Sequence, residues 1–181
     1  MRVINGWVVS VSSAINGRGH FFNKMVKHGF YTIKNSFFEE INDPYLKQNK
    51  DGNRPFYYCI PETIQDIELF WMIPLSSQVE KYQNIIDRKS SKNKPTDGLY
   101  ICTLPSGNKS AFLIQDIFPV IKNDIEREYT LGNNHMILPY DSENEAILKK
   151  AEKVRNLILH GVKLTPTSPD VIKIYNRALN R

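Results

Sequence analysis

The chain is short of the residues that build metal centres and disulfide frameworks. It has two cysteines, Cys59 and Cys102, in 181 residues, and its four histidines are scattered along the sequence. Neither a C-x-x-C nor an H-E-x-x-H pattern occurs, so nothing in the sequence supports metal catalysis, and we expect no cofactor. Each cysteine lies in an apolar or aromatic stretch, which predicts a small buried side chain without a disulfide or a metal.

Long apolar runs are also absent. None approaches the roughly 18 residues that a membrane-spanning helix needs, so we expect no membrane contact and a cytoplasmic protein. The weak apolar run from Trp7 to Val11 is too short and too interrupted for a signal peptide. A chain of this length predicts one domain, which we place at residues 25–181. Residues 1–24 are rich in Gly, Ser and Asn and form an N-terminal extension of uncertain structure.

Positive charge is concentrated near the C-terminus. Residues 149–181 contain eight Lys or Arg and two acids, a balance of +6, whereas residues 1–24 carry +3 and the net charge is +5, which leaves −4 for residues 25–148. A basic surface on a near-neutral body suits a phosphate-bearing partner. Lysine-rich helices exposed to solvent would give the same pattern.

Hydrophobic periodicity predicts an α+β domain with mostly antiparallel strands early and helices concentrated at the C-terminus. The clearest hairpin signal is the turn 105–108, which joins two short apolar runs. In the last helix we expect Ile172, Tyr175 and Leu179 to be buried. The predicted strands are 30–33, 54–60 ended by Pro61, 69–73 ended by Pro74, 98–104 and 109–114; the predicted helices are 36–41, 78–89, 143–160 with a Ser142–Glu145 capping box and Gly161 at its end, and 169–181 opened by Pro169.

The junction between the strand 69–73 and the helix 78–89 is the best candidate for an active site. It presents two adjacent hydroxyls, Ser76 and Ser77, at a helix N-terminus, where free N–H groups and the helix dipole favour an anion such as a phosphodiester. Ser77 and Glu80 also match an S-x-x-E capping box, which would give Ser77 a structural task. No G-x-S-x-G motif points to a serine hydrolase.

RNA cleavage at such a junction would need cations, because charge builds on the phosphoryl oxygens. Arg54, before the aromatic strand, and Lys81, in the first turns of the helix, are the candidates; a salt bridge and a solvated helix face are the alternatives. No general base is evident, since Tyr57, Tyr58 and Tyr82 would need strongly lowered pKa values. Tyr57 and Tyr58 could instead stack on unpaired bases, although core packing is the commoner use of such residues.

Five sequence blocks, taken together and in this order, resemble the CptN toxins of the broader ToxN/AbiQ group of type III toxin–antitoxin systems. The resemblance covers roughly residues 29–181. The blocks are Gly-Phe-Tyr-Thr-Ile-Lys at 29–34, Asn-Arg-Pro at 53–55, Trp-Met-Ile-Pro-Leu-Ser-Ser at 71–77 with Glu-Lys-Tyr at 80–82, Ile-Glu-Arg-Glu-Tyr at 125–129, and Lys-Leu-Thr-Pro-Thr at 163–167.

The resemblance implies a twisted antiparallel sheet flanked by helices and metal-independent RNA cleavage that leaves a 2′,3′-cyclic phosphate. It also implies inhibition by a pseudoknotted repeat RNA antitoxin, which the toxin itself processes, and a closed assembly of several toxins and RNAs. Cellular or phage RNA would be the substrate, and phage defence is one possible role.

The same resemblance assigns residues to the site. The family's hydroxyl pair is matched by Ser76 and Ser77, and its basic residue before the aromatic strand by Arg54. A lysine usually follows the hydroxyl pair closely; positions 78 and 79 are Gln and Val, so we expect Lys81 to take this role. The residues expected to bind RNA are Tyr57, Tyr58, Gln78, Lys149, Lys150, Lys153, Arg155, Lys163 and Lys173.

Three classes of function are therefore considered. The first is an endoribonuclease toxin neutralised by RNA. The second is a non-catalytic RNA-binding module that uses the same groove, which the missing general base keeps open. The third, a structural or protein-interaction domain, is disfavoured by the C-terminal charge and by the resemblance.

Overall fold

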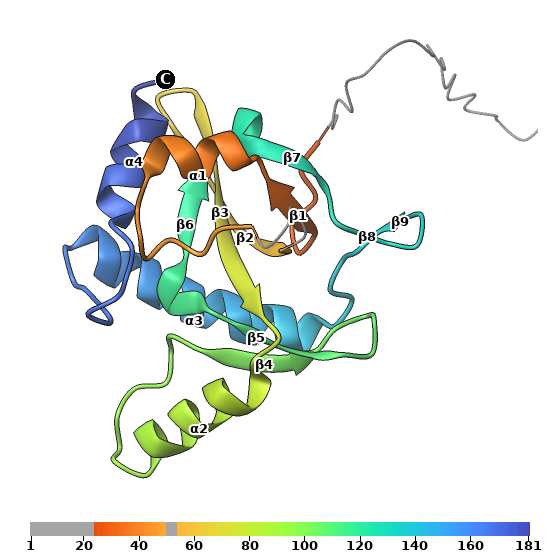
Figure 1. The fold of residues 1–181 in the computed structure, drawn as a ribbon, viewed down its shortest axis with the longest axis vertical. Coiled ribbons are helices and arrows are strands. Elements are labelled where there is room, and N and C mark those ends of the chain that lie inside the picture. Colours follow the sequence, from red (N-terminus) through yellow and green to blue (C-terminus); the bar gives the residue numbers. More distant parts are fainter. Residues whose placement is uncertain (1–23, 50–53) are drawn as a thin grey trace, which may run out of the picture.

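The fold combines a mostly antiparallel sheet with helices, as the sequence predicts (Figure 1). The computed structural model describes residues 24–49 and 54–181. The expected N-terminal extension thus lies almost wholly outside the described residues. Among the described residues, no helix is long and apolar enough to cross a membrane.

The main sheet has the strand order β4-β5-β3-β2-β1-β7, and β6 also pairs with β3. Every strand pairing in it is antiparallel. A short hairpin of β8 and β9 stands apart from it (Figure 1). The strands are β1 (Phe30–Ile33), β2 (Phe56–Ile64), β3 (Ile67–Ser76), β4 (Tyr100–Thr103), β5 (Lys109–Phe112), β6 (Phe118–Val120), β7 (Ile125–Glu128), β8 (Thr130–Leu131) and β9 (Asn134–His135). The helices are α1 (Asn35–Ile41), α2 (Val79–Ser90), α3 (Asp141–Leu159) and α4 (Val171–Leu179), with short 3-10 turns η1 (Ile114–Asp116) and η2 (Lys122–Asp124).

The prolines expected to end β2 and β3 do not end them. Pro61 lies inside β2, opposite Phe70, and Pro74 lies inside β3, opposite Phe56. The pairing of β2 with β1 covers only Phe56 and Tyr57. At Pro61, β2 therefore pairs with β3 alone among the described strands, and no hydrogen-bond donor is needed on its other edge. Pro74 lies where the partner of β3 changes from β6 to β5, a break in the ladder that tolerates a missing donor.

Helices cover both faces of the central strands. Phe56 of β2 stacks against Phe38 of α1, with ring centroids 5.9 Å apart. The next residue, Tyr57, donates a 2.7 Å hydrogen bond to Asn144 of α3. Successive strand residues point to opposite faces, so α1 and α3 lie on opposite sides of β2. Cys59 and Cys102 are buried and free, as predicted.

The end of α3 is confirmed, whereas its predicted start is wrong. Gly161 has a φ of +82°, and the N–H groups of Gly161 and Val162 donate to the carbonyls of Ile158 and Leu157, the hydrogen-bond pair of a Schellman motif. At the other end, the expected capping box on Ser142 does not form. The helix begins two residues earlier, at Asp141, and Tyr140 occupies the N-cap position without a side-chain bond.

The last helix begins later than predicted and buries a different face. Asp170 is its N-cap, and the Asp170 carboxylate accepts a 3.0 Å hydrogen bond from the Lys173 N–H, so Pro169 precedes the helix. Its buried residues are Val171, Ile174 and Ala178, while Ile172 is exposed. The buried stripe has the predicted spacing but lies one residue earlier, because packing against the sheet and not periodicity alone selects the face.

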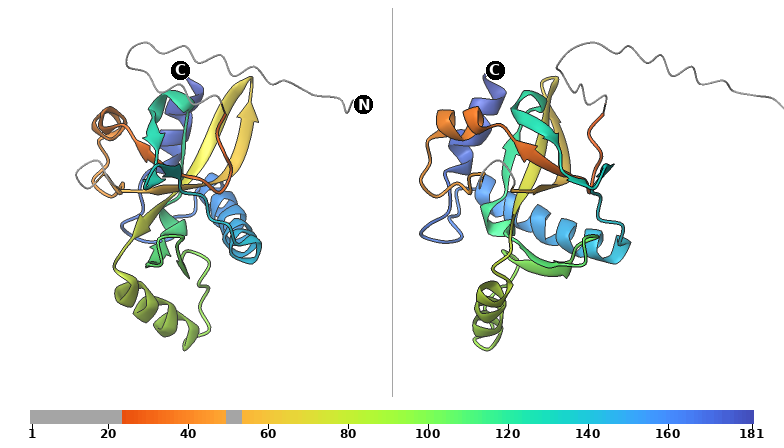
Figure 2. Two further views of the ribbon diagram at one scale, coloured as in Figure 1. Left: turned by 90° about the vertical axis from the view of Figure 1, so that its right-hand side faces the viewer. Right: turned by 45° about the vertical axis from the view of Figure 1, so that its right-hand side comes forward.

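Helix α2 stands apart from the other helices and extends from one end of the sheet (Figure 2). It packs through Tyr82, Ile85 and Ile86 against Leu99, Ala111 and Leu113, a small apolar cluster separate from the main core. The opposite side of α2 therefore faces solvent.

Candidate active site

The two serines occupy the predicted junction, because β3 ends at Ser76 and α2 begins at Val79. Ser76 is half-buried; its hydroxyl accepts a 3.3 Å hydrogen bond from the Gln78 N–H, and its carbonyl accepts one of 3.1 Å from the Ser110 hydroxyl. Ser77 is exposed, and among the described residues no hydrogen bond holds its hydroxyl. Ser77 can thus meet a ligand from solvent, while Ser76 is fixed in place.

The expected capping box of Ser77 and Glu80 is not formed. Gln78 occupies the N-cap position, one residue later than predicted, and makes no side-chain cap. The Ser77 hydroxyl is consequently not committed to the helix. Ser77 therefore does not have the helix-capping role that the S-x-x-E pattern suggested.

Arg54 reaches the same junction from the segment just before β2. Continuing the register that sets Phe56 opposite Pro74 by two residues places Arg54 opposite Ser76. The Arg54 guanidinium donates to the Leu75 carbonyl at 3.5 Å. Burial lowers the pKa of Arg54, and Tyr82 and Asp116 are close enough to oppose that shift.

The first turns of α2 add a lysine and a tyrosine. The exposed Lys81 ammonium donates to the Gln78 side-chain oxygen at 3.4 Å and lies 5.5 Å from the centroid of the Tyr82 ring. Burial raises the Tyr82 pKa, against the smaller lowering effects of Ser76 and Arg54 nearby. Tyr82 is therefore a neutral hydrogen-bonding group near neutral pH rather than a base.

Asp116 is the acidic residue that the sequence patterns did not identify. It ends η1, between the two strands β5 and β6 that both pair with β3, and its side chain is 3% exposed. Burial raises the pKa of Asp116 to about 6, against the attraction of Lys47 and Arg54. The sequence held one local signal for this residue: Asp116 is the single acid in the apolar segment 111–120.

Lys47 completes the group of charges around Asp116. Its ammonium lies 4.0 Å from the Asp116 carboxylate and is about one-third exposed. The junction thus has Arg54 and Lys81 beside the serine segment, with the buried Asp116 near Arg54 and Lys47 beside Asp116. Such an arrangement can hold a phosphodiester, stabilise added negative charge and accept a proton.

The tyrosines of β2 lie in the core and not on the surface. Tyr57 is 0% exposed and Tyr58 is 4% exposed, so neither ring face is open to a base. The Tyr57 hydroxyl joins His28, at 2.7 Å, to Asn144 of α3. Core packing, the alternative considered from the sequence, is the arrangement observed.

Several C-terminal cations are engaged within the protein. Arg155 pairs with Glu62 and covers the Trp71 ring at 5.2 Å. Lys153 pairs with Asp97 at 2.7 Å, and two other lysines donate to backbone carbonyls. These are Lys150 to Thr96 and Lys173 to Ile41. Lys149 and Lys163 are exposed and make no such contact within the described part of the chain.

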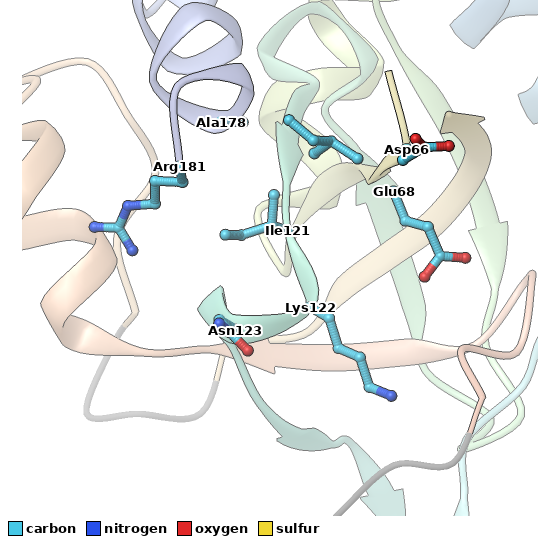
Figure 3. Close-up of a pocket in the computed structure, with 8 residues that line it drawn as sticks. Asp66, Glu68, Ile121, Lys122, Asn123, Ala178 and Arg181 are labelled. Carbon is cyan, nitrogen blue, oxygen red and sulfur yellow. The ribbon is translucent and has the colours of Figure 1, made fainter. Parts of the chain in front are cut away.

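A pocket of about 290 Å³ lies at the far end of β3 from the serines. It is lined by Asp66, Glu68, Lys122 and Arg181 with smaller residues between them, and Figure 3 shows Arg181 on one side of Ile121 and Glu68 on the other. Nine residues of extended strand, roughly 30 Å, separate its rim from Ser76. None of the residues expected to be catalytic lines it.

No group of three His, Cys, Asp or Glu side chains in the described residues could hold a metal ion. The candidate site offers hydroxyls, ammonium and guanidinium groups with one carboxylate. Its donor set suits a phosphate anion and not a divalent cation.

The fold is similar to that of one solved endoribonuclease structure. The chain superimposes on AbiQ, a lactococcal anti-phage endoribonuclease of a type III toxin–antitoxin system, with a TM-score of 0.59. The match covers 84% of this chain and 96% of AbiQ at 13% sequence identity. No protein-family model matches the chain, and no curated protein sequence matches it. The structural likeness confirms the fold that the sequence resemblance implies.

Proposed function

We propose that the protein is an endoribonuclease toxin of the type III toxin–antitoxin class, and that it cleaves RNA at the junction of β3 and α2. The observation that carries this proposal is the meeting of Arg54, Ser76 and Asp116 at one end of β3, beside the exposed hydroxyl of Ser77. The fold shared with AbiQ supports the same class.

The proposed reaction is attack of a ribose 2′-oxygen on the adjacent phosphorus. The 2′-O–P bond forms, the P–O5′ bond breaks, and the products are a 2′,3′-cyclic phosphate and a 5′-hydroxyl end. Asp116 accepts the proton of the 2′-hydroxyl, because a carboxylate with a pKa of about 6 is ionised at neutral pH and remains a useful base. Lys81 donates a proton to the departing 5′-oxygen.

The cations and hydroxyls of the site stabilise the transition state. Arg54 pairs with a non-bridging phosphoryl oxygen, and Ser76 and Ser77 donate hydrogen bonds to the charge that develops there. These groups supply the electrostatic role that a metal ion has in other nucleases, so we propose metal-independent cleavage.

The partner RNA is the second part of the proposal. We propose that a pseudoknotted repeat RNA occupies the site as inhibitor, that the toxin cuts its precursor into repeats, and that toxins and RNAs form a closed assembly. AbiQ is an anti-phage protein, so phage RNA is a candidate substrate and phage defence a candidate role.

Cleavage is tested with purified protein, a mixed-sequence RNA and a chelator. We expect fragments that end in a 2′,3′-cyclic phosphate in the presence of the chelator, and no cut where the nucleotide before the scissile phosphate is 2′-deoxy. Expression should arrest growth, and Ser77→Ala should abolish the arrest. RNA binding without any cleavage would favour the non-catalytic module, and arrest by a folded Ser77→Ala variant would remove Ser77 from the mechanism.

A further inference from the structure

We propose that the solvent-facing side of α2 is a track for the RNA strand that runs away from the cleavage site, an inference that rests on the proposed function. The track consists of Lys81, Asn84 and Arg88 on the helix, followed by Lys92 and Lys94 in the turn after it. The sequence patterns did not predict this track, because they placed the RNA-binding cations mainly on the C-terminal helices.

The helix places these side chains in line with the serines. Positions 77, 81, 84 and 88 are separated by four, three and four residues, so they follow one face of the helix. Ser77, Lys81, Asn84 and Arg88 are all exposed. Seven residues of helix from Lys81 to Arg88 span about 10 Å. Phosphates of one strand spaced by 3.4 Å or more would place two or three along this length.

The charges of the track are available to a ligand. The segment 88–95 contains four cations and no acid. Arg88, Lys92 and Lys94 are exposed, and within the described residues their charged groups have no hydrogen-bond or ion-pair partner. The nearest preceding acid, Asp87, accepts a 2.8 Å hydrogen bond from Gln83.

The C-terminal helices differ in this respect. The charged groups of Lys150, Lys153, Arg155, Lys173 and Arg177 all bond to carboxylates or carbonyls of the protein. RNA would have to break these contacts to use the cations. Arg88, Lys92 and Lys94 need no such exchange among the described residues, so their charge is available to a phosphate backbone.

The backbone of the turn holds the last two cations in place. The N–H groups of Lys92 and Lys94 both donate to the Lys89 carbonyl, at 3.1 and 2.9 Å. The segment beyond is tied to α3, since Lys150 bonds to Thr96 and Lys153 to Asp97. Figure 2 shows α2 extending from the end of the sheet, away from α3 and α4. The apolar residues of α2 pack on the opposite side, against Leu99, Ala111 and Leu113.

The test compares three variants of the full chain. Arg88→Gln/Lys92→Gln/Lys94→Gln, the track variant, removes the three cations of the track that lie beyond the junction and keeps Lys81. Lys27→Gln/Lys109→Gln/Lys122→Gln removes the same charge from exposed positions elsewhere. Lys149→Gln/Lys163→Gln removes the two free cations of the C-terminal region. The probe is a short fluorescent single-stranded RNA carrying 2′-O-methyl groups, which binds but cannot supply the attacking hydroxyl, and affinity is measured by anisotropy over a range of salt.

We expect the track variant to bind about tenfold more weakly and the slope of log K against log salt to fall by about 2, since each lost phosphate contact on a single strand contributes about 0.7. The other two variants should stay within about twofold of wild type. A track variant that binds like the charge-matched control overturns the inference, as does a larger loss in the C-terminal variant.

Cleavage of the unmodified RNA separates this inference from the proposed function. We expect the track variant to show an unchanged kcat and a raised KM, because it retains every group of the junction. A wild-type protein that binds the probe along α2 and cleaves no RNA refutes the proposed function and leaves the track intact. A wild-type protein that cleaves, with a track variant of unaltered KM and affinity, refutes the track alone.

Discussion

The carboxylate of Asp116 lies 4.0 Å from the ammonium of Lys47, inside a site where the aspartate side chain is 3% exposed. This buried carboxylate loses more from desolvation than it gains from the attraction of Lys47 and Arg54, so its pKa rises to about 6. This is the pKa range of a general base that acts near neutral pH, and the first two predictions depend on it.

Asp116→Asn should lower RNA cleavage by at least about a hundredfold, because an amide cannot accept the 2′-hydroxyl proton. In the wild type, kcat/KM should rise with pH through about 6 as the carboxylate ionises, and this limb should be missing in the variant. The measurement is a pH–rate profile between pH 5 and 8. An identical limb in both proteins would exclude Asp116 as the base.

Asp116 should also make the free energy of unfolding depend on pH. Its pKa is higher in the folded protein than in the unfolded chain, so the folded state binds the proton more tightly and this group favours folding most at low pH. As pH rises from about 4 to about 6, unfolding should become easier by on the order of 2 to 3 kcal/mol. Asp116→Asn should flatten this dependence in urea titrations, and an unchanged curve would contradict the prediction.

Substitutions of the two serines should differ in their effect on the free energy of unfolding. Ser77→Ala should change the free energy of unfolding by less than about 0.5 kcal/mol, since its hydroxyl is exposed and no described residue bonds to it. Ser76→Ala should cost about 1 kcal/mol, because its half-buried hydroxyl accepts a hydrogen bond from the Gln78 N–H. Cleavage should fall in both. Thermal and urea unfolding of the two variants test the difference, and equal losses of stability would contradict it.

Arg177 should be essential to the packing of α4. Its guanidinium donates to both oxygens of the buried Asp124 carboxylate, at 2.7 and 3.0 Å, and also pairs with Glu40. Arg177→Gln leaves that carboxylate largely uncompensated and should cost about 3 kcal/mol. The neighbouring Arg181 is 43% exposed and serves as the control, with an expected loss below about 1 kcal/mol. Chemical denaturation measures both, and equal losses would exclude the buried pair as the cause.

Much of the architecture was predictable because local patterns encode local structure. The strand at Phe30–Ile33, the hairpin around the turn 105–108 and the end of α3 at Gly161 all follow from side-chain periodicity and turn chemistry. The wrong predictions concern residues whose structure depends on the strands beside them. Pro61 and Pro74 were expected to stop strands, yet each occupies a point at which the sheet requires no donor.

The candidate site was predicted in part. The sequence located the serine pair, and the structure brings Arg54 and Lys81 to it. It placed Tyr57 and Tyr58 among the RNA-binding residues, and they are core. The sequence could not predict the ion pair of Arg155 with Glu62, since the two residues are far apart in the chain and meet only when α3 packs on the sheet.

By itself the sequence determined the elements and the junction of β3 with α2, because residues within a few positions of one another decide turns, caps and amphipathic faces. Only the tertiary structure decided that Asp116, with Lys47 beside it, lies near Arg54 and Tyr82. That meeting requires β5 and β6 to pair with β3, and such long-range pairing depends on burial summed over the whole core, which no local pattern records.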